Sequence, residues 1–206
     1  MDSSTAVEPN VTETRKELTP DATLRLLMEG NERFVSGKMT GPGDNLAGLR
    51  RQTVRKQEPF ATVLSCVDSR VPVELVFDQT IGRLLVARVA GNIVSPEILG
   101  SLEFGAALLG TKVILVLGHA NCGAVTAAMR AEAAPGLIGS WFAHIQPAVD
   151  RAGGDLETAV KENAKIQAGL LAKSSPLLAG LVKEGKLKIV AGYYDLATGR
   201  VSLLQA

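Results

Sequence analysis

Several residue types are scarce in this sequence, and each scarcity excludes a class of protein. The 206 residues include only two cysteines and two histidines, too few for the disulfide framework of a small secreted domain. The formal net charge is +1, whereas a nucleic-acid or anionic membrane surface needs a clear basic excess. No apolar run approaches the roughly 18 residues of a membrane span, and residues 1–20 contain no apolar segment typical of a signal peptide. We therefore expect no nucleic-acid partner and no membrane span.

The remaining composition is that of a folded domain. Hydrophobic residues make up 46% of the chain, which argues against disorder. A chain of this size buries about 70% of the surface that its unfolded form exposes, so it needs no metal or disulfide merely to fold. The length favours one domain, at about 150 residues per domain. We assign the polar residues 1–19 to a flexible N-terminal arm and residues 20–206 to a single domain.

Short Val- and Leu-rich segments alternate with helical patterns along that domain. Thr19, Pro20 and Asp21 predict a helix start, and a second, basic helix is expected to end near residues 57–59. Further helices are predicted over residues 95–109, 121–133, 140–152, 155–171 and 176–182, and strands over 61–67, 83–89, 112–117, 187–194 and 201–204. The fold class is therefore α/β: a mostly parallel central sheet, with about four parallel strands plus an antiparallel edge strand, flanked by helices.

The carboxyl ends of two predicted strands carry residues with metal-binding chemistry. Cys66, Asp68 and Arg70 follow the first strand, and His119 and Cys122 follow the central one. Open α/β sheets bind ligands outside these strand ends. A single buried cysteine is more often a small core residue, but two thiolates and an imidazole converging on one point suit tetrahedral zinc. Three protein ligands also leave a fourth position open, as in catalytic sites.

The residues around this group fit a metal site. Asn121 is interpreted as a helix N-cap, which would put Cys122 in the first helical turn, where the helix dipole favours the thiolate. In an extended segment Cys66, Asp68 and Arg70 would share one face. The guanidinium would then hold the Asp68 carboxylate ionised and oriented beside the metal. The other histidine, His144, has no such neighbours and is interpreted as an ordinary helix residue.

These motifs resemble the zinc signature of the β-class carbonic anhydrases. The resemblance rests on Cys-x-Asp-Ser-Arg at residues 66–70 and Gly-His-x-x-Cys-Gly at 118–123. It extends from Leu-x-x-Gly-Asn-x-Arg-Phe at 27–34 to Gly-Tyr-Tyr-Asp-x-x-Thr-Gly at 192–199, and so covers all but the N-terminal arm. It implies one Zn²⁺ per chain held by Cys66, His119 and Cys122, with Asp68 and Arg70 as the pair that orients the attacking water.

The resemblance also implies a substrate site and an assembly. Gln57 matches a glutamine that hydrogen-bonds substrate and reaches the site from a partner subunit, and Gly123 joins the substrate-binding residues. Leu85, Ala90 and Phe104 stand where the plant-type pattern has phenylalanine, valine and tyrosine, so we expect an apolar pocket of altered shape. The implied assembly is a homodimer or a homotetramer whose N-terminal helices pack on the neighbouring subunit.

The activity implied by the resemblance is reversible hydration of carbon dioxide to bicarbonate and a proton. Two alternatives stay open: a zinc hydrolase of carbon disulfide or carbonyl sulfide on the same fold, and a non-catalytic zinc scaffold protein. An Asp68–Arg70 pair argues against the scaffold, because a structural zinc site has no use for an ionised carboxylate beside an open position. Reduced cysteine ligands and the lack of a visible leader favour the cytoplasm.

Overall fold

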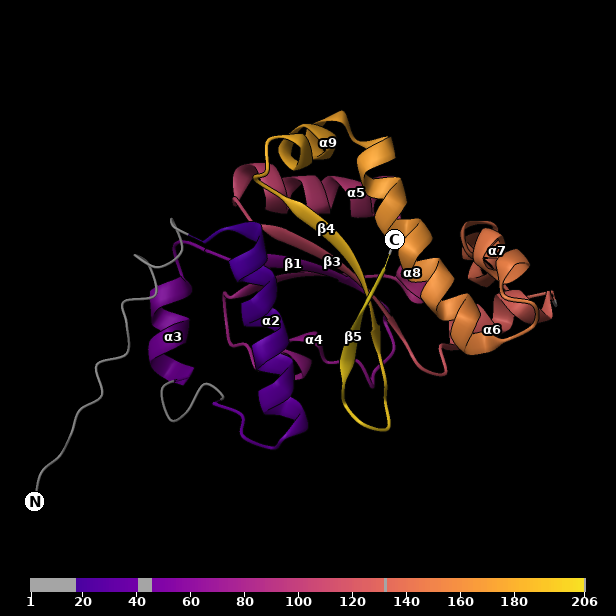
Figure 1. The fold of residues 1–206 in the computed structure, drawn as a ribbon, viewed down its shortest axis with the longest axis horizontal. Coiled ribbons are helices and arrows are strands. Elements are labelled where there is room, and N and C mark those ends of the chain that lie inside the picture. Colours follow the sequence, from indigo (N-terminus) through magenta and orange to yellow (C-terminus); the bar gives the residue numbers. More distant parts are fainter. Residues whose placement is uncertain (1–17, 41–45, 132, 206) are drawn as a thin grey trace, which may run out of the picture.

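A five-stranded sheet forms the centre of the molecule (Figure 1). The computed structural model describes residues 18–40, 46–131 and 133–205, so nearly all of the expected N-terminal arm lies outside the described residues. The strands are β1 (Ala61–Ser65), β2 (Leu84–Arg88), β3 (Val113–His119), β4 (Lys188–Tyr194) and β5 (Val201–Leu204). They follow the order β2-β1-β3-β4-β5, and only β5 is antiparallel to its neighbour. The predicted fold class is confirmed.

Helices cover both faces of this sheet (Figure 1). They are α2 (Pro20–Val35), α3 (Leu46–Thr53), α4 (Val73–Val76), α5 (Pro96–Glu103), α6 (Gly123–Arg130), α7 (Phe142–Arg151), α8 (Leu156–Ser174) and α9 (Pro176–Lys183). Single turns lie at η2 (Ala90–Asn92), η3 (Phe104–Leu108, a π-helical turn) and η4 (Ile138–Trp141). The side chains of Thr19, Ser95, Asp155 and Ser175 cap the amino ends of α2, α5, α8 and α9.

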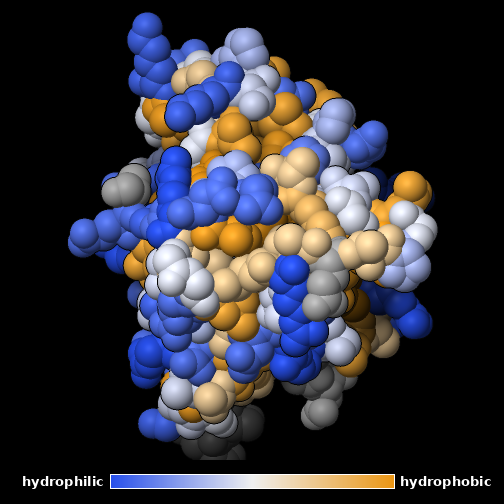
Figure 2. Space-filling model, turned by 90° about the vertical axis from the view of Figure 1, so that its right-hand side faces the viewer, coloured by the Kyte–Doolittle hydropathy of each residue, from blue (hydrophilic) through white to orange (hydrophobic). Residues whose placement is uncertain are grey.

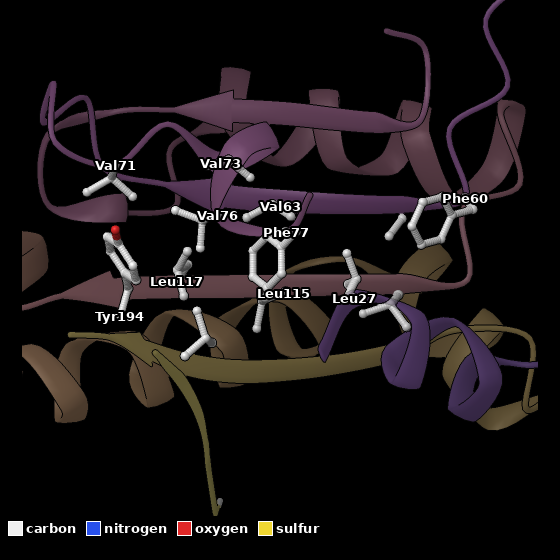
Figure 3. Close-up of a cluster of buried hydrophobic side chains, with 13 residues drawn as sticks. Leu27, Phe60, Val63, Val71, Val73, Val76, Phe77, Leu115, Leu117 and Tyr194 are labelled. Carbon is white, nitrogen blue, oxygen red and sulfur yellow. The ribbon is translucent and has the colours of Figure 1, made fainter. Parts of the chain in front are cut away.

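Two layers of buried apolar side chains hold the helices to the sheet. On one face, Leu27 of α2 and Phe77, which directly follows α4, pack against Val63, Leu115 and Leu117 of β1 and β3 (Figure 3). On the other face, α5, α8 and α9 contribute buried leucines that pack against the alternate residues of the same strands, namely Leu102, Leu171 and Leu178 against Leu64, Ile114 and Val116. Burial on both faces explains why residues 113–117 of β3 are continuously apolar rather than alternating.

The first helix is tied to the end of the chain by a buried asparagine. Asn31 in α2 donates from Nδ2 to the carbonyls of Val76 (3.0 Å) and Gly199 (2.9 Å), and its Oδ1 accepts from the Val201 amide (2.8 Å). These contacts join the two outermost motifs of the resemblance. By contrast, α3 buries only Gly48, and its Leu46 is 50% exposed.

The predicted helix over residues 95–109 is divided. Regular α-helix ends at Glu103, and a π-helical turn follows over Phe104–Leu108. A Cβ on Gly105 would come within 2.6 Å of Leu85 Cδ2 and 2.7 Å of Thr62 Oγ1, so the backbone here lies directly on the sheet. A larger residue here would have to displace both of these side chains. The short helix α4, which follows Arg70, was not predicted.

The surface carries no membrane-spanning element within the described part of the chain. Among the helices described there, none is long and apolar enough to cross a bilayer. Figure 2 shows the side of the molecule that carries α6 and α7, where apolar side chains reach the surface between hydrophilic ones.

Candidate metal centre

The adjacent strands β1 and β3 deliver two of the three predicted ligands to one place. Ser65 pairs with Leu117, so Cys66 and His119 leave the sheet side by side at its carboxyl edge. Cys122 follows three residues after β3. The ligand atoms of Cys66, His119 and Cys122 all lie within 4.8 Å of one another, and all three residues are buried. The convergence predicted from the two motifs is therefore present.

The turn between β3 and α6 differs from the prediction. Cys122, not Asn121, occupies the N-cap position, and α6 begins at Gly123. Asn121 adopts a left-handed conformation with φ of 51°, one that asparagine tolerates better than most residues. The interpretation of Asn121 as the N-cap is wrong. The Cys122 sulfur still lies at a helix amino end, where the dipole favours negative charge.

The His119 imidazole is arranged as a ligand. Its Nδ1 lies 2.9 Å from the carbonyl oxygen of Ala120, and a carbonyl accepts only from a protonated nitrogen, so Nδ1 carries the hydrogen. The lone pair of Nε2 is then free. Nε2 is buried and has no hydrogen-bond partner among the described residues, although buried polar atoms are rarely left unpaired. A backbone carbonyl that accepts from the other ring nitrogen is typical of metal-bound histidine.

The two cysteines influence each other's ionisation. The neighbouring Cys122 thiol lowers the pKa of Cys66, and hydrogen bonds from backbone amides lower it further. The same contact raises the pKa of Cys122, together with burial and the charge on Cys66. Without a cation between the two sulfurs, ionisation of Cys66 is favoured and ionisation of Cys122 as well is disfavoured. A divalent cation would remove this conflict, because coordinated thiols are deprotonated.

The donor set suits zinc. Two sulfurs and one imidazole nitrogen are ligands that Zn²⁺ prefers, with Zn–S near 2.3 Å and Zn–N near 2.0 Å. Tetrahedral ligands at those lengths are about 3.7 Å apart, and the three atoms here already lie within 4.8 Å. The unpaired Nε2 and the opposed thiols both fit a metal at this point.

Asp68 and Arg70 form the predicted pair beside this cluster. Arg70 Nε donates to Asp68 Oδ1 (3.0 Å), and Nη2 donates to Oδ2 (2.8 Å). We expected an extended segment here, but the chain turns at residues 69–70. The Arg70 backbone amide also donates to Asp68 Oδ1 (2.9 Å). The Arg70 guanidinium holds the pKa of Asp68 well below its usual range. Asp68 Oδ2 lies 3.8 Å from His119 Nε2.

Two arginines connect the parts of the site. Arg70 Nη2 also donates to the Asn121 carbonyl (3.1 Å), which links both motifs. Arg88, at the end of β2, donates to the carbonyls of Cys66 (2.8 Å) and Asp68 (2.6 Å). Sequence reasoning missed Arg88. Its position at the carboxyl end of a third parallel strand was the signal, because such ends share one edge of the sheet.

The predicted pocket residues fall into two groups. Ala90 lies between Val89, whose amide donates to Ser65, and Gly91, whose amide donates to Cys66 Sγ, so it is next to the cluster. Gly123 begins α6 directly after Cys122.

The other predicted pocket residues lie toward the amino end of the sheet. Leu85 pairs with Thr62, which is about 13 Å from Cys66 at about 3.3 Å per residue. Phe104 precedes Gly105, which packs on the same threonine. Gln57 is exposed in the segment leading into the amino end of β1.

Comparison with known proteins points to one family. The family model described as carbonic anhydrase matches residues 61–201. Carbonic anhydrase 2 of Mycobacterium tuberculosis is 35% identical and covers 89% of this chain and 92% of that protein. The carbonic anhydrase of Pseudomonas aeruginosa is 30% identical and covers 76% of this chain and 78% of its own length.

Solved structures agree with the sequence relatives. The β-carbonic anhydrase CcaA has a TM-score of 0.72 at 26% identity, covering 88% of this chain and 95% of its own. The Coccomyxa β-carbonic anhydrase, solved with acetazolamide, has a TM-score of 0.68 at 25% identity, covering 88% and 86%. The family model matches 141 of the 206 residues, and the matched range includes Cys66, His119 and Cys122. The chain therefore belongs to the β-carbonic anhydrase family of enzymes.

Proposed function

We propose that this protein catalyses the reversible hydration of carbon dioxide to bicarbonate and a proton. One Zn²⁺ per chain would be held by Cys66, His119 and Cys122, with Asp68 and Arg70 acting beside it. The observation that carries the proposal is the buried, unpaired Nε2 of His119, which lies among two sulfurs and 3.8 Å from an ionised carboxylate. Membership of the family supports the same reaction.

When bound, zinc would supply a Lewis acid able to lower the pKa of water from 15.7 to about 7. Asp68 would accept a hydrogen bond from the attacking water and leave an oxygen lone pair directed at the substrate carbon. A carboxylate can do this only while it is ionised and fixed. Arg70 keeps the Asp68 carboxylate ionised and fixed through two hydrogen bonds. Arg88 would hold the backbone on which Cys66 and Asp68 lie.

The substrate site would be completed by a second subunit. Ala90 and Gly123 would line it from the same chain, whereas Gln57, Leu85 and Phe104 lie toward the amino end of the sheet, away from their own Cys66. We propose that these three serve the site of a partner in a homodimer or homotetramer. Phe104 and Leu108, both in the turn η3, are 42% and 75% exposed, as expected of a surface that a partner covers.

Mixed dimers can test this exchange. Subunits carrying Asp68→Asn and subunits carrying Gln57→Ala are each expected to have low activity. If Gln57 serves the partner's site, a mixed dimer contains one intact site and regains up to half of the wild-type activity per dimer. If Gln57 serves its own site, both sites of the mixed dimer are defective, and no recovery on mixing would contradict the proposal.

Two further proposals concern the extent of the domain and its location in the cell. We propose that residues 20–206 act as one zinc domain, since elements from Pro20 to Leu204 surround one sheet. We propose the cytoplasm as its location, because reducing conditions keep ligand thiols available.

The activity is tested by stopped-flow measurement of carbon dioxide hydration on a sample of known zinc content. Hydration that depends on the zinc supports the proposal. Release of sulfide from carbon disulfide without hydration of carbon dioxide would contradict it.

A further inference from the structure

Two buried amide side chains on α8 lie behind the metal centre. Asn163 and Gln167 are 1% and 0% exposed, and they occupy the same stripe of the helix one turn apart. Neither belongs to the ligand cluster or to the Asp68–Arg70 pair. Buried amides are costly unless they are hydrogen-bonded, so their partners indicate what they hold in place.

Asn163 and Gln167 hold the turn η2, which follows β2, in place. Asn163 Nδ2 donates to the carbonyl of Gly91 (2.7 Å). Gln167 Oε1 accepts from the Val94 amide (2.9 Å), and Gln167 Nε2 donates to Asn163 Oδ1 (3.2 Å). The same Nε2 donates to the carbonyl of His144 in α7 (3.1 Å). The two side chains thus hold both ends of the segment from Gly91 to Val94 and orient each other.

The turn η2 also contacts the sulfur of Cys66, one of the three proposed metal ligands. The Gly91 amide points at Cys66 Sγ, with N and S 3.4 Å apart. Gly91 has φ of 68°, and an added Cβ would come within 2.7 Å of Ile145 Cδ1, so the turn is confined between α7 and α8. The Gly91 N–H belongs to the peptide unit with Ala90, and the Gly91 carbonyl belongs to the next peptide unit. By holding that carbonyl, Asn163 restricts how the Gly91 backbone can rotate and so supports the position of the amide.

A hydrogen bond to a ligating thiolate withdraws negative charge from the sulfur. Such contacts tune metal affinity and the behaviour of the metal, and their loss typically costs 10- to 100-fold in affinity or activity. We propose that Asn163 and Gln167 are positioning residues that set the charge on Cys66 through the Gly91 amide. This inference rests on the proposed metal function, since it assumes that Cys66 is a ligand.

The test uses the full chain loaded with Co²⁺ in place of zinc. The thiolate-to-cobalt absorption reports charge on the sulfur ligands, and competition with a chromophoric chelator gives the Zn²⁺ dissociation constant. We expect Asn163→Ala to shift the absorption and to raise the dissociation constant about 10- to 100-fold. The matched control is Leu171→Ala, which removes a buried apolar side chain from the same stripe of α8 but none of the hydrogen bonds to Gly91 and Val94. It should lower the thermal midpoint but leave the absorption unchanged.

Each outcome decides the matter. An unchanged absorption and dissociation constant in Asn163→Ala, or equal changes in the Leu171→Ala control, would overturn the inference while leaving the metal site intact. If Asn163→Ala does not fold, Gln167→Met removes the amide that orients Asn163 while keeping the side-chain length. It should give a smaller change in the same direction, and no change would overturn the inference. A wild-type chain that binds neither zinc nor cobalt would overturn the proposed function and this inference with it.

Discussion

Replacement of Asp68 by asparagine tests the proposed role of the carboxylate most sharply. Asparagine has the same shape, but one of its two terminal atoms is an NH₂ group. Arg70 donates to both oxygens of Asp68. In the variant, one of these N–H groups would face the NH₂ group of the new asparagine, which is also a donor, so the asparagine side chain must rotate or lose a hydrogen bond. The charge is lost as well.

The size of the effect follows from the one hydrogen bond that the reacting water would lose. A hydrogen bond to a charged group contributes about 1.5–3 kcal/mol. At about 1.4 kcal/mol for each factor of ten, turnover should fall about 10- to 150-fold. Zinc content should not change, because Asp68 is not one of the three ligands.

The assay is stopped-flow carbon dioxide hydration, with zinc measured on the same preparation. The matched control is Asp21→Asn, which makes the same chemical change at an exposed site paired with Lys188 at the amino end of the sheet. It should retain full turnover. Near-normal turnover in Asp68→Asn would remove Asp68 from the mechanism, and loss of zinc would give it a role in metal binding instead.

Three further substitutions test other parts of the site and fold. Cys122→Ser should lose zinc as well as activity, and one zinc per chain retained in the purified variant would refute the ligand assignment. Arg88→Gln removes two hydrogen bonds to carbonyls around Cys66; urea unfolding should show a loss of about 1–3 kcal/mol together with reduced turnover, and unchanged values would exclude a supporting role. Gly105→Ala places a Cβ 2.6 Å from Leu85 Cδ2, so stability should fall by about 1–3 kcal/mol, and an unchanged unfolding midpoint would show that the contact relaxes freely.

Most of the fold could be predicted from the sequence. The strand β3 was found because its residues 113–117 form a continuous apolar run, as expected of a strand buried on both faces. The strands β1 and β2 were found because they are short, Val- or Leu-rich and bounded by turn residues. Helix starts were found where a capping side chain precedes a proline, as at Ser95 and Ser175. The ends were harder. The π-helical turn after Glu103 depends on how closely Gly105 approaches the sheet, which is a tertiary contact that no local pattern reveals.

The candidate site was predictable where chemistry is concentrated in short motifs. His119 ends β3 and both cysteines come shortly after strands, and parallel strands bring such residues to one edge. The supporting contacts were not predictable. Asn121 looked like an N-cap by residue type, but its carbonyl is used by Arg70 and its backbone is left-handed. Asn163 lies far along the chain from Gly91, and only the packing of α8 brings them together.

The central claim is that this chain hydrates carbon dioxide at the Cys66–His119–Cys122 metal centre. The most direct measurement is the stopped-flow hydration rate of one preparation as zinc is removed by a chelator and then restored. The account predicts a rate that follows the zinc content and reaches its maximum at one zinc per chain. A rate that persists without zinc, or a fully loaded protein that does not hydrate carbon dioxide, would contradict it.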